Sequence, residues 1–146
     1  MSPRVLVLNG PNLNMLGVRQ PEVYGRNSYA DIVAVCERAA EARGAVAEVR
    51  QTNDEAEMIG WIHAVAREKS FDAIVINPAA WTHTSVALAD ALVIPEVPVF
   101  EVHISNVHAR EAFRHHSYVS PIAAGVIAGF GIAGYGHAVD RAVDRA

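Results

Sequence analysis

The chain has very little cysteine and lysine. Cys36 is the one cysteine among 146 residues, which excludes a disulfide framework within the chain, and we interpret it as a buried thiol of a cytoplasmic protein. Lys69 is the one lysine beside eleven arginines, and its surroundings, Arg67-Glu68-Lys69-Ser70, predict the solvated end of a helix. Because an exposed lysine is a poor Schiff-base nucleophile, we expect any carbonyl chemistry here to proceed without an imine.

Long apolar runs and an excess of positive charge are also missing. No run approaches the roughly 20 apolar residues of a membrane span, so we expect no membrane segment. The first residues, MSPRVLVLNG, contain no signal-peptide cleavage pattern. A net charge of −4 argues against general binding of nucleic acid.

Two common cofactor motifs receive no support. The phosphate-binding pattern GxxxxGK[ST] does not occur. The segment Gly129 to Gly134 matches GxGxxG, but that fingerprint belongs in a first βαβ unit, and here too little chain follows it. We interpret these glycines as the close packing of a glycine-rich last helix.

The seven histidines raise the question of a metal site. His83, His103 and His108 are candidate ligands, with Glu101 as an oxygen donor, but their spacing matches neither HExxH nor a Cys/His finger. We therefore expect no metal site.

Apolar runs rich in β-branched residues alternate with helical patterns along the chain. Strands are predicted at residues 5–8, 45–52, 73–76, 99–102 and 122–127. Helices are predicted after a capping box at Ser28-Tyr29-Ala30-Asp31, after Asn53 or Asp54, after Thr84 or Ser85, within 105–116 and from Ile132 onward. Strands that are apolar throughout indicate a parallel sheet with both faces covered. The sequence thus predicts α/β architecture: one flavodoxin-like domain over residues 1–146, a doubly wound five-stranded parallel sheet with helices on both faces.

Polar groups follow three of the predicted strands. The first strand leads into Asn9 and a polar loop from Asn12 to Tyr24, the third into Asn77 and His83, and the fourth into His103. Ligands of doubly wound sheets bind beyond the carboxyl ends of the strands. A site at this edge is the interpretation that the three segments favour together.

Two pairs of residues carry specific chemistry. Glu101 and His103 are two apart on a strand, so both side chains point to one side and Glu101 could orient His103; an incidental strand-end pair is the alternative. Arg19 lies five residues before Tyr24 in the polar loop, which glycines near both ends would allow to close as a lid. A nearby guanidinium favours the phenolate of a tyrosine. The alternative is a surface tyrosine beside a solvated arginine.

Four segments together resemble the type II 3-dehydroquinate dehydratases. They are LNGPNLNMLGVRQPEVYG, INPAAWTHTS, EVHISNVHARE and FRHHSYVSP, and they occur in order across almost the whole chain. The chain departs from the family pattern at Ala79 and Ala80, where many members have glycine, and at Gln20, where glutamate is common. None of these departures touches a group that should carry a proton in the reaction.

The resemblance implies a flavodoxin-like subunit, a cytoplasmic dodecamer built as a tetramer of trimers, and neither cofactor nor metal. It implies the reversible dehydration of 3-dehydroquinate to 3-dehydroshikimate, in the shikimate pathway of aromatic amino acid biosynthesis or in quinate breakdown. By resemblance Tyr24 is the base and Arg19 its activating cation, while His103 is the general acid supported by Glu101. Asn12 would position a water that stabilises the enolate. The substrate would be held by Asn77, His83, Arg114 and the backbone of Ile104 and Ser105, with Asp90 approaching from a neighbouring subunit.

Two other classes of function remain open from the residues alone. One is a flavodoxin-like module that binds a nucleotide or a flavin without catalysis, and it gives Tyr24 no role. The other is a metal-dependent hydrolase that uses His83 and His103.

Overall fold

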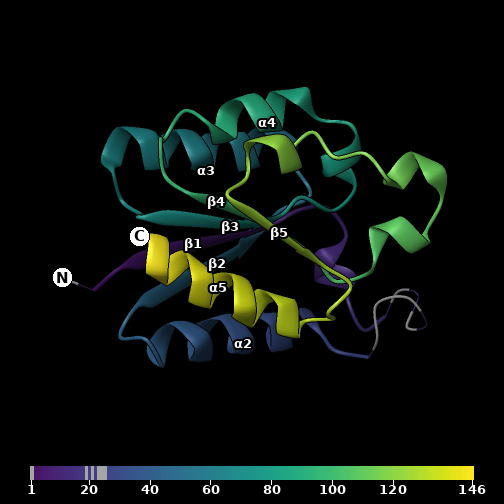
Figure 1. The fold of residues 1–146 in the computed structure, drawn as a ribbon, viewed down its shortest axis with the longest axis horizontal. Helices are drawn as coiled ribbons and strands as arrows, with labels where there is room; N and C mark the ends of the chain where they lie inside the picture. Colours follow the sequence, from purple (N-terminus) through teal and green to yellow (C-terminus); the bar gives the residue numbers. More distant parts are fainter. Residues whose placement is uncertain (1, 19, 21, 23–25) are drawn as a thin grey trace.

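The computed structural model describes residues 2–18, 20, 22 and 26–146. Within them, five parallel strands form a sheet in the order β2-β1-β3-β4-β5, as Figure 1 shows. The strands are β1 (Arg4–Asn9), β2 (Val46–Gln51), β3 (Ala73–Asn77), β4 (Val99–His103) and β5 (Gly125–Ala128). This is the strand order of flavodoxin-like doubly wound sheets, so the predicted fold class is confirmed.

Two helices cover each face of the sheet (Figure 1). One face carries α2 (Tyr29–Glu41) and α5 (Ala133–Arg145), and the other carries α3 (Glu55–Glu68) and α4 (Val86–Leu92). Short 3-10 helices connect the elements: η1 (Leu13–Met15), η2 (Ala79–His83), η3 (Val107–Ala109), η4 (Ala112–Arg114) and η5 (Ser120–Ile122). None of the helices in the described part of the chain is long and apolar enough to cross a bilayer.

The predicted caps begin the helices. Ser28 and Asp31 form the expected capping box of α2, in which each side chain accepts a hydrogen bond from the backbone N–H of the other. Asp54, rather than Asn53, caps α3 by accepting hydrogen bonds from two backbone N–H groups of its first turn. Ser85 caps α4 in the same way through the N–H of Leu88, at 2.9 Å.

The core has two halves because neighbouring residues of a strand point to opposite faces. Val5 and Val7 pack under α2 and α5, while Leu6 and Leu8 pack under α3 and α4. Cys36 is fully buried in the first half, as expected, and this burial raises the pKa of its thiol to about 12. The thiol therefore stays protonated and unreactive at neutral pH.

The edge strands are less buried than the sequence pattern indicated. Strands β1, β3 and β4 are almost wholly buried, but β2 and β5 are exposed or half-buried along their length. Arg50 of β2 lies over the rings of Trp61 and Phe71, with its guanidinium carbon 5.5 and 5.7 Å from the ring centroids. The expectation of uniformly buried strands was therefore wrong for the two edges.

The fifth strand begins three residues later than predicted. Residues 120–122 form η5 around Pro121, whose ring fixes φ and removes a backbone donor. The N–H of Ala124 donates to the carbonyl of Val99 at 2.7 Å, and regular pairing with β4 starts at Gly125. The segment 105–116, predicted to hold one short helix, contains η3 and η4 instead.

Two glycines of the GxGxxG segment shape the turn before α5. Gly129 and Gly131 have φ values of +84° and +61°, which favour glycine. Their N–H groups donate to the carbonyls of His103 and Ile104 at 3.3 and 3.1 Å. Only Gly134 lies in the helix, buried against the sheet, so the interpretation as helix packing holds for that glycine alone. The other two fix the end of β4.

Tyr135 of α5 connects the carboxyl ends of β1 and β3. Its buried hydroxyl donates to Asn9 Oδ1 at 2.7 Å and accepts a hydrogen bond from Asn77 Nδ2 at 2.8 Å. The Oδ1 of Asn77 accepts from the N–H of Ala79 at 3.0 Å, so both ends of this amide are held.

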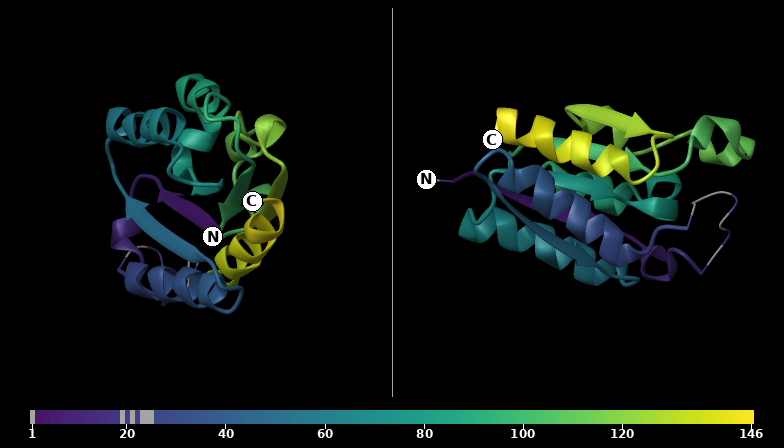
Figure 2. Two further views of the ribbon diagram at one scale, coloured as in Figure 1. Left: turned by 90° about the vertical axis from the view of Figure 1, so that its left-hand side faces the viewer. Right: turned by 90° about the horizontal axis from the view of Figure 1, so that it is seen from below.

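In Figure 2, right, η3 and η4 project from the end of the molecule opposite the C-terminus of α5.

We expect Tyr135→Phe to lower the free energy of unfolding by roughly 1–3 kcal/mol, because it leaves buried amide groups without a partner. Denaturant titration measures the change, and Tyr118→Phe is the control because Tyr118 is 38% exposed. Equal stability of the two variants would contradict this role of the hydroxyl.

Candidate active site

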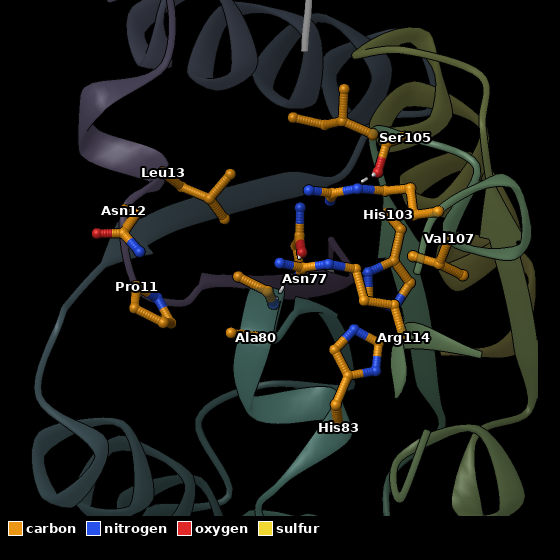
Figure 3. A pocket seen from close by; sticks show the side chains of 13 residues that line it. Pro11, Asn12, Leu13, Asn77, Ala80, His83, His103, Ser105, Val107 and Arg114 are labelled. Carbon is orange, nitrogen blue, oxygen red and sulfur yellow. Dashed lines mark hydrogen bonds between the residues drawn. The ribbon is translucent and has the colours of Figure 1, made fainter. Parts of the chain in front are cut away.

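An open cavity of about 490 Å³ lies where β1, β3 and β4 end (Figure 3). Pro11, Asn12 and Leu13 lie on one side of it, and His103, Val107 and Arg114 lie on the opposite side. The lining includes most of the residues expected from the sequence: Asn12, Asn77, His83, His103, Ile104, Ser105 and Arg114. The structure thus brings together the polar groups that the three strand ends deliver.

Two of the expected residues are placed outside this lining, and two others are not among the described residues. Glu101 does not line this cavity and lies buried behind His103. Asp90 lies on the exposed side of α4, away from the lining. Arg19 and Tyr24 are outside the described residues. Their connection leaves β1 at the cavity, since Asn12 and Leu13 belong to its lining.

Glu101 and His103 project to the same side of β4, as the strand period predicted. Their side chains are 1% and 7% exposed, and Nε2 of His103 is hydrogen-bonded to Oε2 of Glu101. An ionised carboxylate carries no hydrogen, so the Nε2–H of the ring is the donor. This contact leaves Nδ1 as the nitrogen that can serve a ligand.

The carboxyl group of Glu101 is ionised despite its burial. Burial by itself would raise the pKa of Glu101, but hydrogen bonds from His103, Ser120 and Thr82 and the attraction of His103 outweigh that effect. The pKa therefore lies below its usual range. A buried anion therefore lies beside the ring of His103.

His83 is held in its neutral form. Burial has the largest effect and lowers the pKa of its imidazole. The hydrogen bond with the His116 carbonyl opposes burial, the charges of His103 and Arg114 lower the pKa by smaller amounts, and the net direction is downward. Its Nδ1 lies 2.7 Å from the carbonyl oxygen of His116, which can only accept, so Nδ1 carries the hydrogen. The Nε2 of His83 is then an acceptor for a hydroxyl group.

The cavity is suited to an anion. Arg110 and Arg114 are among its lining residues, and no described residue of the lining is acidic. Arg114 is oriented by Glu111, which binds its Nε, and Arg110 Nη1 lies 3.5 Å from Ser105 Oγ. This local positive charge offsets the net charge of −4 on the whole chain.

Sequence reasoning missed Arg110 and three residues around Glu101. Arg110 lies within the segment EVHISNVHARE, and the three hydroxyl residues, Thr82, Ser117 and Ser120, lie within INPAAWTHTS and FRHHSYVSP. Their presence in those segments was the available signal. No spacing rule connects them with Glu101, because they come from irregular segments.

The structure gives the metal hydrolase alternative no support among the residues it describes. No group of three or more His, Cys, Asp or Glu side chains in them could hold a metal ion. The two histidines of that alternative use one ring nitrogen each for a hydrogen bond within the protein.

Comparison with known proteins identifies the family. Residues 3–143 match the family model of dehydroquinase class II. The chain is 57% identical over 145 residues to the 3-dehydroquinate dehydratase 2 of Pseudomonas aeruginosa, covering 99% of this chain and 97% of that protein.

Two solved structures resemble this one over nearly their whole length. The type II dehydroquinase of Propionibacterium acnes has a TM-score of 0.92 and 49% identity, covering 99% of this chain and 98% of that one. The type II dehydroquinase of Butyrivibrio crossotus has a TM-score of 0.93 and 40% identity, covering 97% of both chains. The family predicted from the four sequence segments is confirmed, and the chain belongs to the class II dehydroquinases.

Proposed function

We propose that this chain dehydrates 3-dehydroquinate to 3-dehydroshikimate through an enolate, with Tyr24 as the base and His103 as the general acid. The observation that carries the proposal is the buried Glu101–His103 pair beside a cavity lined by cations and amides. The reaction would serve the shikimate pathway or quinate breakdown, in the cytoplasm.

The acid step follows from the geometry of His103. Loss of the substrate hydroxyl as water requires a proton. Because Nε2 of His103 is committed to Glu101, its Nδ1–H is the proton that can be transferred. Glu101 stabilises the imidazolium before the transfer and keeps the ring in place afterwards.

The base step rests on family resemblance together with the position of the loop. Tyr24 and Arg19 belong to the connection between β1 and α2, which starts at the cavity with Asn12. A free tyrosine has a pKa of about 10, so acting as a base near neutrality requires a drop of about 3 units, or roughly 4 kcal/mol. In this proposal the guanidinium of Arg19 supplies that stabilisation in a site shielded from water.

The enolate would be stabilised by hydrogen bonds. Lys69 is exposed and forms the C-cap of α3, as its sequence indicated, and it does not line the cavity. An imine is therefore not part of the proposal. Asn12 would position a water on the developing oxyanion, in the manner of an oxyanion hole.

The remaining lining groups match a polyhydroxylated carboxylate. Backbone N–H groups of Ile104 and Ser105 would bind the carboxylate, and the segment is fixed because Ile104 accepts a hydrogen bond from Gly131 at 3.1 Å. Asn77, neutral His83 and Arg114 would contact the hydroxyls.

The direct test is to add 3-dehydroquinate and follow the ultraviolet absorbance of the conjugated enone, with and without a chelator. We expect Tyr24→Phe and His103→Gln each to lower kcat by at least about 100-fold, because each removes a proton-transfer group. Tyr118→Phe is the matched control and should retain full activity. Near-normal turnover by Tyr24→Phe would remove Tyr24 as the base.

The proposed role of Asp90 depends on the assembly of several subunits. Its exposed position on α4 is outside the cavity lining of its own chain, and the same helix exposes Val86 to 52%. We propose that it reaches the active site of a neighbouring subunit in a dodecamer of trimers.

Mixing two inactive variants tests this arrangement. We expect Asp90→Ala and His103→Gln chains to regain activity when they are refolded together, because about a quarter of randomly assembled sites combine both native residues. Each variant refolded alone is the control. An inactive mixture, or a fully active Asp90→Ala enzyme, would contradict a role across the interface.

A further inference from the structure

Three hydroxyl groups surround the buried carboxylate of Glu101. Thr82 of η2 donates to Oε2 at 2.8 Å, and Ser117, between η4 and η5, donates to the same oxygen at 3.0 Å. Ser120 of η5 donates to Oε1. Together with Nε2 of His103, these groups occupy both oxygens of a side chain that is 1% exposed.

The hydrogens on Oε2 are shared between two of the hydroxyls. Thr82 Oγ1 and Ser117 Oγ lie 2.6 Å apart, within hydrogen-bond distance of each other as well as of Oε2. Each hydroxyl has one hydrogen, so two hydrogens serve three contacts. Loss of either hydroxyl leaves the other free to donate to Oε2.

Ser120 has no such substitute. Its hydroxyl is the donor found on Oε1 among the described residues. The turn that presents it is held by Ser117 Oγ, which accepts from the backbone N–H groups of Val119 and Ser120 at 3.1 Å each. The three-residue delay of β5 caused by Pro121 therefore places Ser120 against Glu101.

We propose that Thr82, Ser117 and Ser120 are positioning residues which keep Glu101 a carboxylate, and that Ser120 in particular sets the pH at which Glu101 takes up a proton. The inference rests on the proposed role of His103 as general acid. A buried carboxyl group that loses a donor takes up a proton more readily. A neutral Glu101 would no longer stabilise the imidazolium of His103.

The other charged or titratable groups around the pair stay unchanged in the test. They line the neighbouring cavities of the site and are His83, His108, Arg110, Arg114, His115 and His116. None of them is a hydrogen-bond partner of Ser120 Oγ in the contacts described above. A change at Ser120 therefore reaches His103 through Glu101.

The experiment measures the titration of Glu101 by carbon-13 NMR of glutamate-labelled protein without substrate, with the Glu101→Gln spectrum identifying its signal. We expect Ser120→Ala to raise the pKa of Glu101 by about one unit, the size of effect of one charge-assisted hydrogen bond. Ser120→Thr keeps the hydroxyl and should restore the wild-type value. Thr82→Val should have a smaller effect than Ser120→Ala, because Ser117 then donates to Oε2.

Kinetics separate this inference from the proposed function. If an ionised Glu101 supports His103 in the reaction, the acidic limb of kcat in Ser120→Ala moves to higher pH by the same amount as the NMR titration. An unchanged Glu101 titration in Ser120→Ala overturns the inference and leaves the proposed function intact. A shifted titration with an unmoved acidic limb supports the inference and contradicts the proposed support of His103 by Glu101.

Discussion

The site depends on one hydrogen bond, from Nε2 of His103 to the buried carboxylate of Glu101. Burying a charge is costly unless partners compensate it, and here an imidazole and three hydroxyls do so. The resulting anion fixes one nitrogen of His103 and leaves the other for chemistry. In the proposed reaction this is the nitrogen that turns a hydroxyl group into water.

Segments on both faces of the sheet hold the two residues of that hydrogen bond in position. The period of β4 puts Phe100 and Val102 into one half of the core and turns Glu101 and His103 to the other side. Behind the strand end, backbone bonds from Gly129 and Gly131 fix His103 and Ile104. The hydroxyl of Tyr135 fixes the ends of β1 and β3 through its hydrogen bonds with Asn9 and Asn77. Elements far apart in the chain therefore hold the cavity rigid at its base.

The sequence predicted the features that follow regular periods. Alternating strands and helices predicted a parallel sheet with helices on both faces, and the two-residue spacing of Glu101 and His103 predicted their common direction. Four segments also predicted the family, and with it seven residues of the cavity lining.

Irregular segments account for what the sequence did not predict. Pro121 forms a 3-10 turn that delays β5, and no strand or helix period places Ser120 beside Glu101. The role of the Tyr135 hydroxyl was not predicted either, because its partners, Asn9 and Asn77, lie on other elements. The central claim is that Nε2 of His103 carries a hydrogen held by an ionised Glu101. Nitrogen-15 NMR of histidine-labelled protein tests it directly: a protonated Nε2 throughout the titration of His103 is the predicted result, and an unprotonated Nε2 in the neutral ring would contradict it.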